Sequence, residues 1–289
     1  MWADGKCPQT HRPWGPVVLP APALSADTGA RRAGREKSLR AGHGSIRPQP
    51  VVRVVEILGC LLPEDRLYDV EQGVWWQDEP TGGTARVGVV APLGAFAGPF
   101  RELTFRPVTG PIARGRSVAT IESIRFTGAV RLPVEAEVVE RNEAVRQRPR
   151  LLNDRPYAEG WVVRVRAKRA EEPAAVMRPA SAVRAEVEAE IRSRRIRCWP
   201  LTPELELVEV GLECSAVLVR LNEELARRAP GEALLLVTDD PTSPIEMVRW
   251  SDQTGEALLA HRVEGTLHQF LVQKLEHPVP RRRSASGAR

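Results

Sequence analysis

Among the charged side chains, lysine is the scarcest. The 42 basic residues include only four lysines, which leaves 42 minus 4, or 38, arginines. The four are Lys6, Lys37, Lys168 and Lys274. Arginine keeps its proton up to a pKa above about 12, so it does not replace lysine as a neutral amine nucleophile. Amine chemistry therefore has few places to occur in this chain.

Long apolar runs are absent as well. No stretch of about 18 apolar residues occurs, so the sequence predicts no membrane-spanning helix. The first residues show no signal-peptide pattern, because the apolar stretch from Val17 to Leu24 is short and interrupted by prolines. We therefore expect a cytoplasmic protein with no membrane partner.

Cysteines are few and scattered. They stand at Cys7, Cys60, Cys198 and Cys214, without a Cys-x-x-Cys pair and without histidines at ligand spacing. This pattern predicts neither a zinc site nor a disulfide framework. A pairing of Cys198 with Cys214 stays open as an alternative.

The positive charge is concentrated at the two ends of the chain. The net charge is +5 and the pI about 9.4, with arginine clusters in residues 31–40 and 281–283. We interpret residues 1–50 as a disordered basic tail, or an over-extended gene start, and residues 277–289 as a second basic tail. No nucleic-acid-binding motif accompanies them, so nucleic acid is not the expected partner.

Residues 51–168 show the pattern of a β domain. Short alternating apolar runs are separated by Gly, Pro and Asn, which is typical of a small barrel or sandwich. The expected strands are Val51–Val55, Thr84–Val90, Arg101–Phe105, Ser117–Ser123, Glu135–Arg141 and Trp161–Val165.

The motifs of this region resemble the glycine-cleavage H protein, a lipoyl-domain-like β structure. The matching segments are Pro63-Glu64-Asp65 with Tyr68, Thr84–Val89, Ile121–Arg125, Val138–Glu143 and Leu151–Trp161. The last contains Asn153, Pro156-Tyr157 and Gly160-Trp161, in the order of the family's closing motif. The resemblance implies a barrel-sandwich fold over about residues 62–167.

One position departs from this family. The family carries lipoate on the lysine of Glu-Ser-Val-Lys at a hairpin tip, whereas this chain reads Glu122-Ser123-Ile124-Arg125. A guanidinium is not acylated under the same conditions, because its lone pairs are delocalised. We therefore expect a domain without a lipoyl group. Arg125 is either a solvated charge or a docking contact for an anionic partner.

We interpret residues 169–199 as a linker that contains a helix. Val183, Val187 and Ile191 are four residues apart, which predicts a helix over Ser181–Arg195 with a narrow apolar stripe. Such a helix packs lightly on one domain or remains an exposed linker.

Residues 200–276 follow the order strand, helix, strand, helix, strand, strand. The strands are expected at Leu205–Val210, Glu232–Thr238, Ala257–Val263 and Thr266–Gln273. The helices follow Cys214 and Ser243; the second combines an N-cap serine, a first-turn proline and the capping-box Glu246, and precedes Gly255. This order predicts a two-layer βαβαββ domain with two helices on one face of a sheet.

Cys214 stands where the first strand turns into the first helix. A thiol at the positive end of a helix dipole can have a lowered pKa and act as a nucleophile or sulfur carrier. The alternative is a buried core cysteine.

This second unit resembles the TusA/SirA-like sulfurtransferases. The matching segments are Gly211–Cys214, Pro230-Gly231, Thr238–Pro241, Arg249-Trp250 and Thr254-Gly255. The family's sulfur-accepting cysteine corresponds to Cys214, so the resemblance favours a functional thiol. Ser215 replaces the proline that the family has after the cysteine.

Several other candidates are interpreted as structural. Asp239 and Asp240 suit a turn before a helix, and Arg249-Trp250 suits a packing or cation–π element. His261 and His268 predict a cross-strand surface pair rather than a metal site. Trp75-Trp76 suits core and edge packing.

Together the patterns predict an α+β protein in which an H-protein-like β domain precedes a TusA-like domain. The expected function is a sulfur relay through Cys214 between donor and acceptor proteins, with the β domain as a recognition module. No diffusible cofactor is implied. The alternatives are a non-catalytic regulatory or scaffold protein and, from the basic tails, a nucleic-acid-associated protein.

Overall fold

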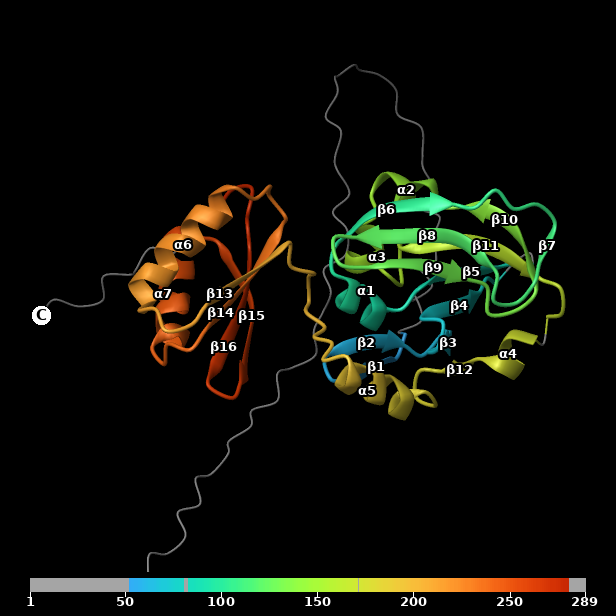
Figure 1. Cartoon of the computed structure of the whole chain (residues 1–289), viewed down its shortest axis with the longest axis horizontal. Coiled ribbons are helices and arrows are strands. Elements are labelled where there is room, and N and C mark those ends of the chain that lie inside the picture. The colour runs from blue at the N-terminus through green and yellow to red at the C-terminus, as the bar shows by residue number, and fades with distance from the viewer. Residues whose placement is uncertain (1–51, 81–82, 171, 281–289) are drawn as a thin grey trace, which may run out of the picture. The chain divides into compact units, whose positions relative to one another are not determined.

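The computed structural model describes residues 52–80, 83–170 and 172–280, except for the side chain of Cys214. The two predicted tails therefore lie wholly or mostly outside the described residues. Within these ranges no helix is long and apolar enough to cross a bilayer. Two parts are described separately below: the β part, residues 52–198, and the α/β part, residues 201–276 (Figure 1).

The β part is built mainly of short strands (Figure 1). Its strands are β1 (Val54–Ile57), β2 (Cys60–Pro63), β3 (Leu67–Asp69), β4 (Val74–Asp78), β5 (Ala85–Val89), β6 (Phe100–Phe105), β7 (Pro111–Ile112), β8 (Ser117–Ser123), β9 (Thr127–Arg131), β10 (Ala136–Arg141), β11 (Trp161–Ala167) and β12 (Arg178–Pro179). Its helices are α1 (Ala91–Ala97), α2 (Glu143–Gln147), α3 (Leu151–Asp154), α4 (Glu172–Val176) and α5 (Arg184–Ser193).

Two sheets enclose the main core of this part. A seven-stranded sheet has the order β12-β3-β4-β5-β11-β10-β7, and a three-stranded sheet has the order β6-β8-β9. Inward-facing residues such as Leu103, Ile121 and Val165 alternate with exposed or half-buried ones, which is the period-two pattern of a strand with one buried face. The predicted H-protein-like β fold is confirmed.

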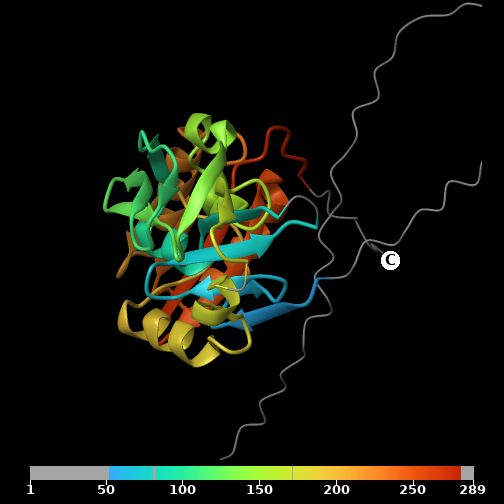
Figure 2. The ribbon, with the colours of Figure 1, turned by 90° about the vertical axis from the view of Figure 1, so that its right-hand side faces the viewer.

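Helix α5 belongs to the packing of the β part. Its apolar stripe of Val187 and Ile191, with Val183 before it, is buried in a second cluster with Ile57 and Leu62. Figures 1 and 2 show α5 beside β1 and β2. Of the two alternatives for this helix, packing on a domain is therefore the one observed, and the stripe is narrow because only one side of the helix is covered.

The α/β part contains β13 (Leu205–Glu209), α6 (Cys214–Ala226), β14 (Ala233–Thr238), α7 (Ser243–Thr254), β15 (Ala257–Glu264) and β16 (Leu267–Gln273). Its sheet has the order β13-β14-β16-β15, with β13 and β14 parallel and the other pairs antiparallel. All six residues of β14 are buried, as expected for the continuous apolar run at this position. The predicted βαβαββ order is observed.

The two helices of the α/β part follow the predicted positions, with one difference. Val217, Leu221 and Leu225 of α6 are buried four residues apart against the sheet, and Gly255 ends α7 with a φ of 77°. The predicted capping box is wrong: the N-cap of α7 is Thr242, and the Ser243 hydroxyl donates to the carbonyl of Asp240.

Candidate functional site

The candidate site is the junction between β13 and α6. β13 ends at Glu209, and five residues later Cys214 opens α6 with Glu213 as its N-cap. The backbone of Cys214 is described, and it occupies the first helical position predicted for it. The N–H groups and the positive dipole end of a helix first turn favour an anion at this place.

The loop before Cys214 is fixed at two points. The N–H of Gly211 donates to Asp239 Oδ1 at 2.7 Å, and Glu209, 5% exposed, forms an ion pair with Arg220 at 3.1 Å between Nε and Oε1. Gly211 has a φ of 76°, the left-handed conformation that favours glycine. The motif Gly-x-x-Cys thus needs its glycine for the turn that leads into the helix.

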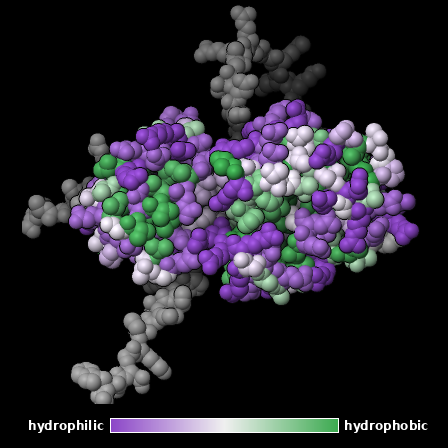
Figure 3. Space-filling view, viewed as in Figure 1, coloured by the Kyte–Doolittle hydropathy of each residue, from purple (hydrophilic) through white to green (hydrophobic). Residues whose placement is uncertain are grey.

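Residues around the start of α6 are accessible. Glu213 and Ser215, on either side of Cys214, are both exposed. Three nearby apolar side chains, Val210, Leu212 and Val219, are 53%, 39% and 57% exposed. Figure 3 shows hydrophobic surface on the α/β part. Exposed apolar side chains around a charged junction are typical of surfaces that meet other proteins.

The paired aspartates have separate roles. Asp239 holds Gly211, and Asp240 Oδ1 accepts hydrogen bonds from the N–H and the hydroxyl of Thr242, both at 2.7 Å. Asp240 therefore stabilises the turn before α7, which is the role that the sequence predicts for it. The contact from Asp239 to the cysteine loop was not expected from the sequence.

The two histidines of the closing hairpin do face each other. His261 Nε2 and His268 Nδ1 are 3.1 Å apart, and the His261 ring stacks on Phe270 with ring centroids 4.4 Å apart. Burial, and secondly the neighbouring His268 ring, lower the pKa of His261 below its usual value of 6.5. No group of three or more metal-ligating side chains occurs among the described residues.

The tryptophans take structural roles. Trp75 and Trp76 are fully buried in the two clusters of the β part. Trp250 is buried and donates to Asn222 Oδ1 at 2.8 Å, whereas Arg249 pairs with Glu246 at 2.6 Å. The packing interpretation of Arg249-Trp250 is therefore the observed one, and the ion pair with Glu246 occupies the arginine.

Arg125 lies at the β8–β9 hairpin tip, as the resemblance implies. It is exposed, but its Nε lies 3.4 Å from the carbonyl oxygen of Ala97, which also accepts a hydrogen bond from the Ser123 hydroxyl at 2.7 Å. Ala97 ends α1, where a helix carries partial negative charge and favours a cation. The neighbouring Ile124 is 88% exposed. The tip thus presents an isoleucine while its arginine contacts the helix end.

A cavity lies beside this hairpin. It has a volume of about 200 Å³ and is lined on its apolar side by Phe96, Phe126 and Val187. Glu190 and Arg194 of the α5 region add charge to its wall. The cavity therefore depends on the packing of α5 described above.

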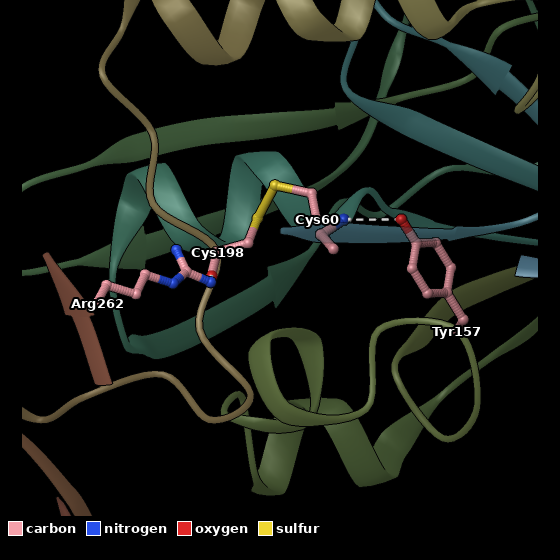
Figure 4. Close-up of a disulfide and its surroundings, with 5 residues drawn as sticks. Cys60, Tyr157, Cys198 and Arg262 are labelled. Atoms are coloured by element: carbon pink, nitrogen blue, oxygen red, sulfur yellow. Dashed lines mark hydrogen bonds between the residues drawn. A yellow bond between two sulfur atoms is a disulfide. The ribbon is translucent and has the colours of Figure 1, made fainter. Parts of the chain in front are cut away.

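Cys198 is bonded to Cys60, which corrects two expectations from the sequence (Figure 4). The chain does contain a disulfide, and Cys198 pairs with Cys60 rather than with Cys214. The two cysteines are 138 residues apart, so no local spacing could indicate the pairing. Both are buried, at 0% and 6% exposure.

The fold and the junction at Cys214 define the class of protein. It has two modules: a lipoyl-domain-like β structure and, joined to it, an α/β unit of the sulfurtransferase type. Residues 66–189 match the family model described as glycine cleavage H-protein, and residues 209–274 match the one described as sulfurtransferase TusA. The second match begins at Glu209 and includes Cys214 and the loop before it.

Relatives of known name cover the β part. The chain is 34% identical over 149 residues to glycine cleavage system H protein 5 of Aquifex aeolicus, covering 50% of this chain and 99% of that protein. It is 38% identical over 116 residues to probable glycine cleavage system H protein 3 of Saccharolobus solfataricus, covering 39% and 80%. The chain belongs to the glycine cleavage H-protein family, and it carries a TusA domain in the same polypeptide.

A solved structure is also similar to the β part. The crystal structure of a glycine cleavage system H protein from Mycobacterium marinum covers 44% of this chain and 98% of its own, with 23% identity and a TM-score of 0.38.

Proposed function

We propose that this protein is a sulfur carrier that relays sulfur between protein partners through Cys214. One observation carries the proposal: Cys214 opens α6 after the short loop that follows β13, inside the segment that matches the TusA family. A cysteine at the start of a helix is in the electrostatic environment that lowers a thiol pKa. Glu213 next to it opposes this effect with a negative charge.

The proposed reaction has two balanced steps. The Cys214 thiolate attacks the outer sulfur of a donor persulfide R–S–SH; the donor S–S bond breaks, R–S⁻ leaves, and Cys214 becomes Cys–S–SH. A thiolate of the acceptor protein then attacks this outer sulfur and regenerates the Cys214 thiolate. No external oxidant or reductant is consumed, because each step exchanges one S–S bond for another.

The partners in this proposal are proteins. Exposed Val210, Leu212 and Val219 near the start of α6 offer apolar contact around the cysteine. In the β part, the exposed Ile124 at the hairpin tip gives the recognition module an apolar contact of its own. Arg125 leaves the hairpin tip of this module without an acylable amine, so the part of the module in the proposal is recognition.

We propose the cytoplasm as the location, because sulfur transfer needs a reduced thiol at Cys214 and cytoplasmic cysteines are kept reduced. The Cys60–Cys198 disulfide is compatible with such a compartment when burial protects it from thiols, and both of its cysteines are buried.

Mass spectrometry after incubation with sodium polysulfide tests the carrier function. We expect one additional sulfur on the Cys214 peptide, and none in Cys214→Ser. Cys7→Ser serves as the matched control and should load sulfur like the natural chain. An unmodified Cys214 peptide under conditions that load the thiol of a reference persulfide carrier contradicts the proposal.

The second candidate is a non-catalytic regulatory or scaffold protein. It is favoured by Arg125, which has replaced the acylated residue of the H-protein family in one of the two modules. Maleimide labelling against pH separates the candidates. A Cys214 thiol that reacts with a midpoint below the usual value of about 8.5 supports the carrier, and a midpoint above it supports the scaffold.

A further inference from the structure

Asp239 reaches the cysteine loop because of the sheet register. β13 and β14 run parallel, with Glu209 opposite Thr238, so both strands end at the same edge of the sheet. The next residue after Thr238 is Asp239, and its Oδ1 accepts the N–H of Gly211 at 2.7 Å. The two residues are 28 positions apart, so this contact is made only when the two strands pair.

The hydrogen bond between Gly211 and Asp239 stabilises one of the several backbone conformations that the glycine can adopt. Gly211 has a φ of 76°, and among the described residues other than its two chain neighbours no atom lies within 4 Å of the position that a Cβ would take. Its left-handed conformation is therefore not enforced by crowding. Glycine visits many conformations, so an external partner is needed to select one. The hydrogen bond to the Asp239 carboxylate is such a partner.

A second contact holds the beginning of the same loop. Glu209 is buried and paired with Arg220, which lies on α6 itself. The loop between Glu209 and Cys214 is thus tied to α6 through Glu209 and, two residues later, through Gly211 to Asp239, the residue that follows β14. Two of its residues, Leu212 and Glu213, are exposed and lie beyond both anchors.

We propose that Asp239 is a positioning residue for Cys214: its hydrogen bond to Gly211 fixes the turn through which the cysteine enters the first turn of α6. The inference rests on the proposed function, since it names the group that prepares the carrier thiol. A thiolate gains from the helix N-terminus only when its backbone is held in the first turn. Misplacement of a reacting group is costly for the rate.

The hydrogen bond and the charge of Asp239 act in opposite directions. The hydrogen bond orders the turn, whereas the carboxylate charge near the thiol opposes its ionisation. Asp239→Ala removes both, and Asp239→Asn removes the charge while keeping an oxygen that accepts the Gly211 N–H. The pair of variants therefore separates positioning from electrostatics.

The test measures the alkylation rate of Cys214 against pH and its sulfur loading from polysulfide, both in the full-length chain. We expect Asp239→Ala to slow both by roughly fivefold to tenfold, as for the loss of one typical intramolecular hydrogen bond. Asp239→Asn should remain within about twofold of the natural chain. Glu223→Ala, which removes an exposed carboxylate of α6, is the matched control and should change neither rate.

A structural readout accompanies the rates. Amide hydrogen exchange of the peptide that contains Gly211 should be faster in Asp239→Ala, while exchange across β14 stays slow. Rates for Asp239→Ala equal to those of the natural chain overturn the inference, and so does an Asp239→Asn variant as slow as Asp239→Ala. If the natural chain takes up no sulfur but its alkylation still depends on Asp239, the carrier function fails and the positioning of the thiol stands.

Discussion

Cys198 is covalently joined to Cys60, and its carbonyl oxygen accepts a hydrogen bond from Arg262 of β15 (Figure 4). The same guanidinium lies 4.3 Å from the ring centroid of Trp199. Residues 198–199 are therefore fixed by a disulfide on one side and by an arginine on the other. A segment that the sequence presents as part of a linker has defined contacts.

Removal of this disulfide should lower stability. A double variant, Cys60→Ala with Cys198→Ala, opens a loop of 138 residues and should lower the free energy of unfolding by about 2–5 kcal/mol. Both residues are changed together so that no buried thiol is left unpaired. Urea unfolding without reductant measures the effect, and Cys7→Ser is the control.

Thiol counting checks the bond itself. The unreduced, unfolded chain should react with a thiol reagent at Cys7 and Cys214, which is four cysteines minus the two that are bonded. Four reactive thiols without prior reduction would contradict the disulfide.

The second prediction concerns the hairpin tip. Arg125→Lys places a primary amine at the position where the resemblance to the H-protein family puts the acylated lysine. We expect a lipoyl-transferring enzyme to add one lipoyl group to this variant and none to the natural chain, because only the amine has a free lone pair once deprotonated. Intact mass measures the adduct.

Arg131→Lys is the control for this experiment, since it adds a lysine at the far end of β9 from the tip. A lipoyl group on the natural chain would contradict the prediction, because it would have to lie on a residue other than Arg125. An Arg125→Lys variant that stays unmodified would also contradict it, because features of the tip other than the missing amine would then prevent acylation.

The third prediction concerns the glycine of the closing motif. A Cβ at Gly160 would lie 2.5 Å from the carbonyl oxygen of Leu151 and 2.7 Å from that of Arg155. Both are backbone atoms, which cannot move as a side-chain tip can. Gly160→Ala should therefore lower the free energy of unfolding by about 1–3 kcal/mol.

Gly94→Ala is the matched control. A Cβ there meets its nearest neighbours at 3.4 Å and 3.5 Å, which is close to ordinary contact, and an alanine favours the helix α1. Equal losses of stability in the two variants, measured by thermal unfolding, would contradict the steric explanation.

The fourth prediction concerns pH. The pKa of His261 is lowered in the folded chain by burial and then by His268, so below pH 6.5 the unfolded chain binds more protons than the folded one. The contribution of His261 to stability is thus complete above pH 6.5, and it is lost as the pH falls from 6.5 through the lower pKa that this histidine has in the folded chain. NMR titration should give a pKa for His261 below 6.5.

His268→Gln should raise the pKa of His261 toward 6.5, because the second ring is removed, while His277→Gln should leave it unchanged. With the pKa raised, stability should fall less between pH 7 and pH 5. A His261 pKa at or above 6.5 in the natural chain would sink this prediction.

Local patterns in the sequence predicted the elements around Cys214 well. The apolar period of α6 and the continuous apolar run of β14 each lie within one segment, so neither depended on distant parts of the chain. The left-handed Gly255 after α7 was likewise predicted from a local signal.

Contacts between distant segments were not predictable in the same way. The hydrogen bond from Gly211 to Asp239 depends on the parallel register of two strands, and the Cys60–Cys198 bond joins residues 138 positions apart. The contact of Arg125 with Ala97 depends on α1, a short helix with no apolar period to reveal it. In each case the residue type was visible, but its partner was set by the tertiary fold.

The position of β14 between β13 and β16 has a consequence for synthesis on the ribosome. One edge of β14 pairs with β13, which precedes it in the chain. The other edge pairs with β16 (Leu267–Gln273), which follows some thirty residues later. Until that last strand has left the exit tunnel, an almost wholly apolar segment has an open edge. During that interval the nascent chain is open to pairing with other chains along this edge.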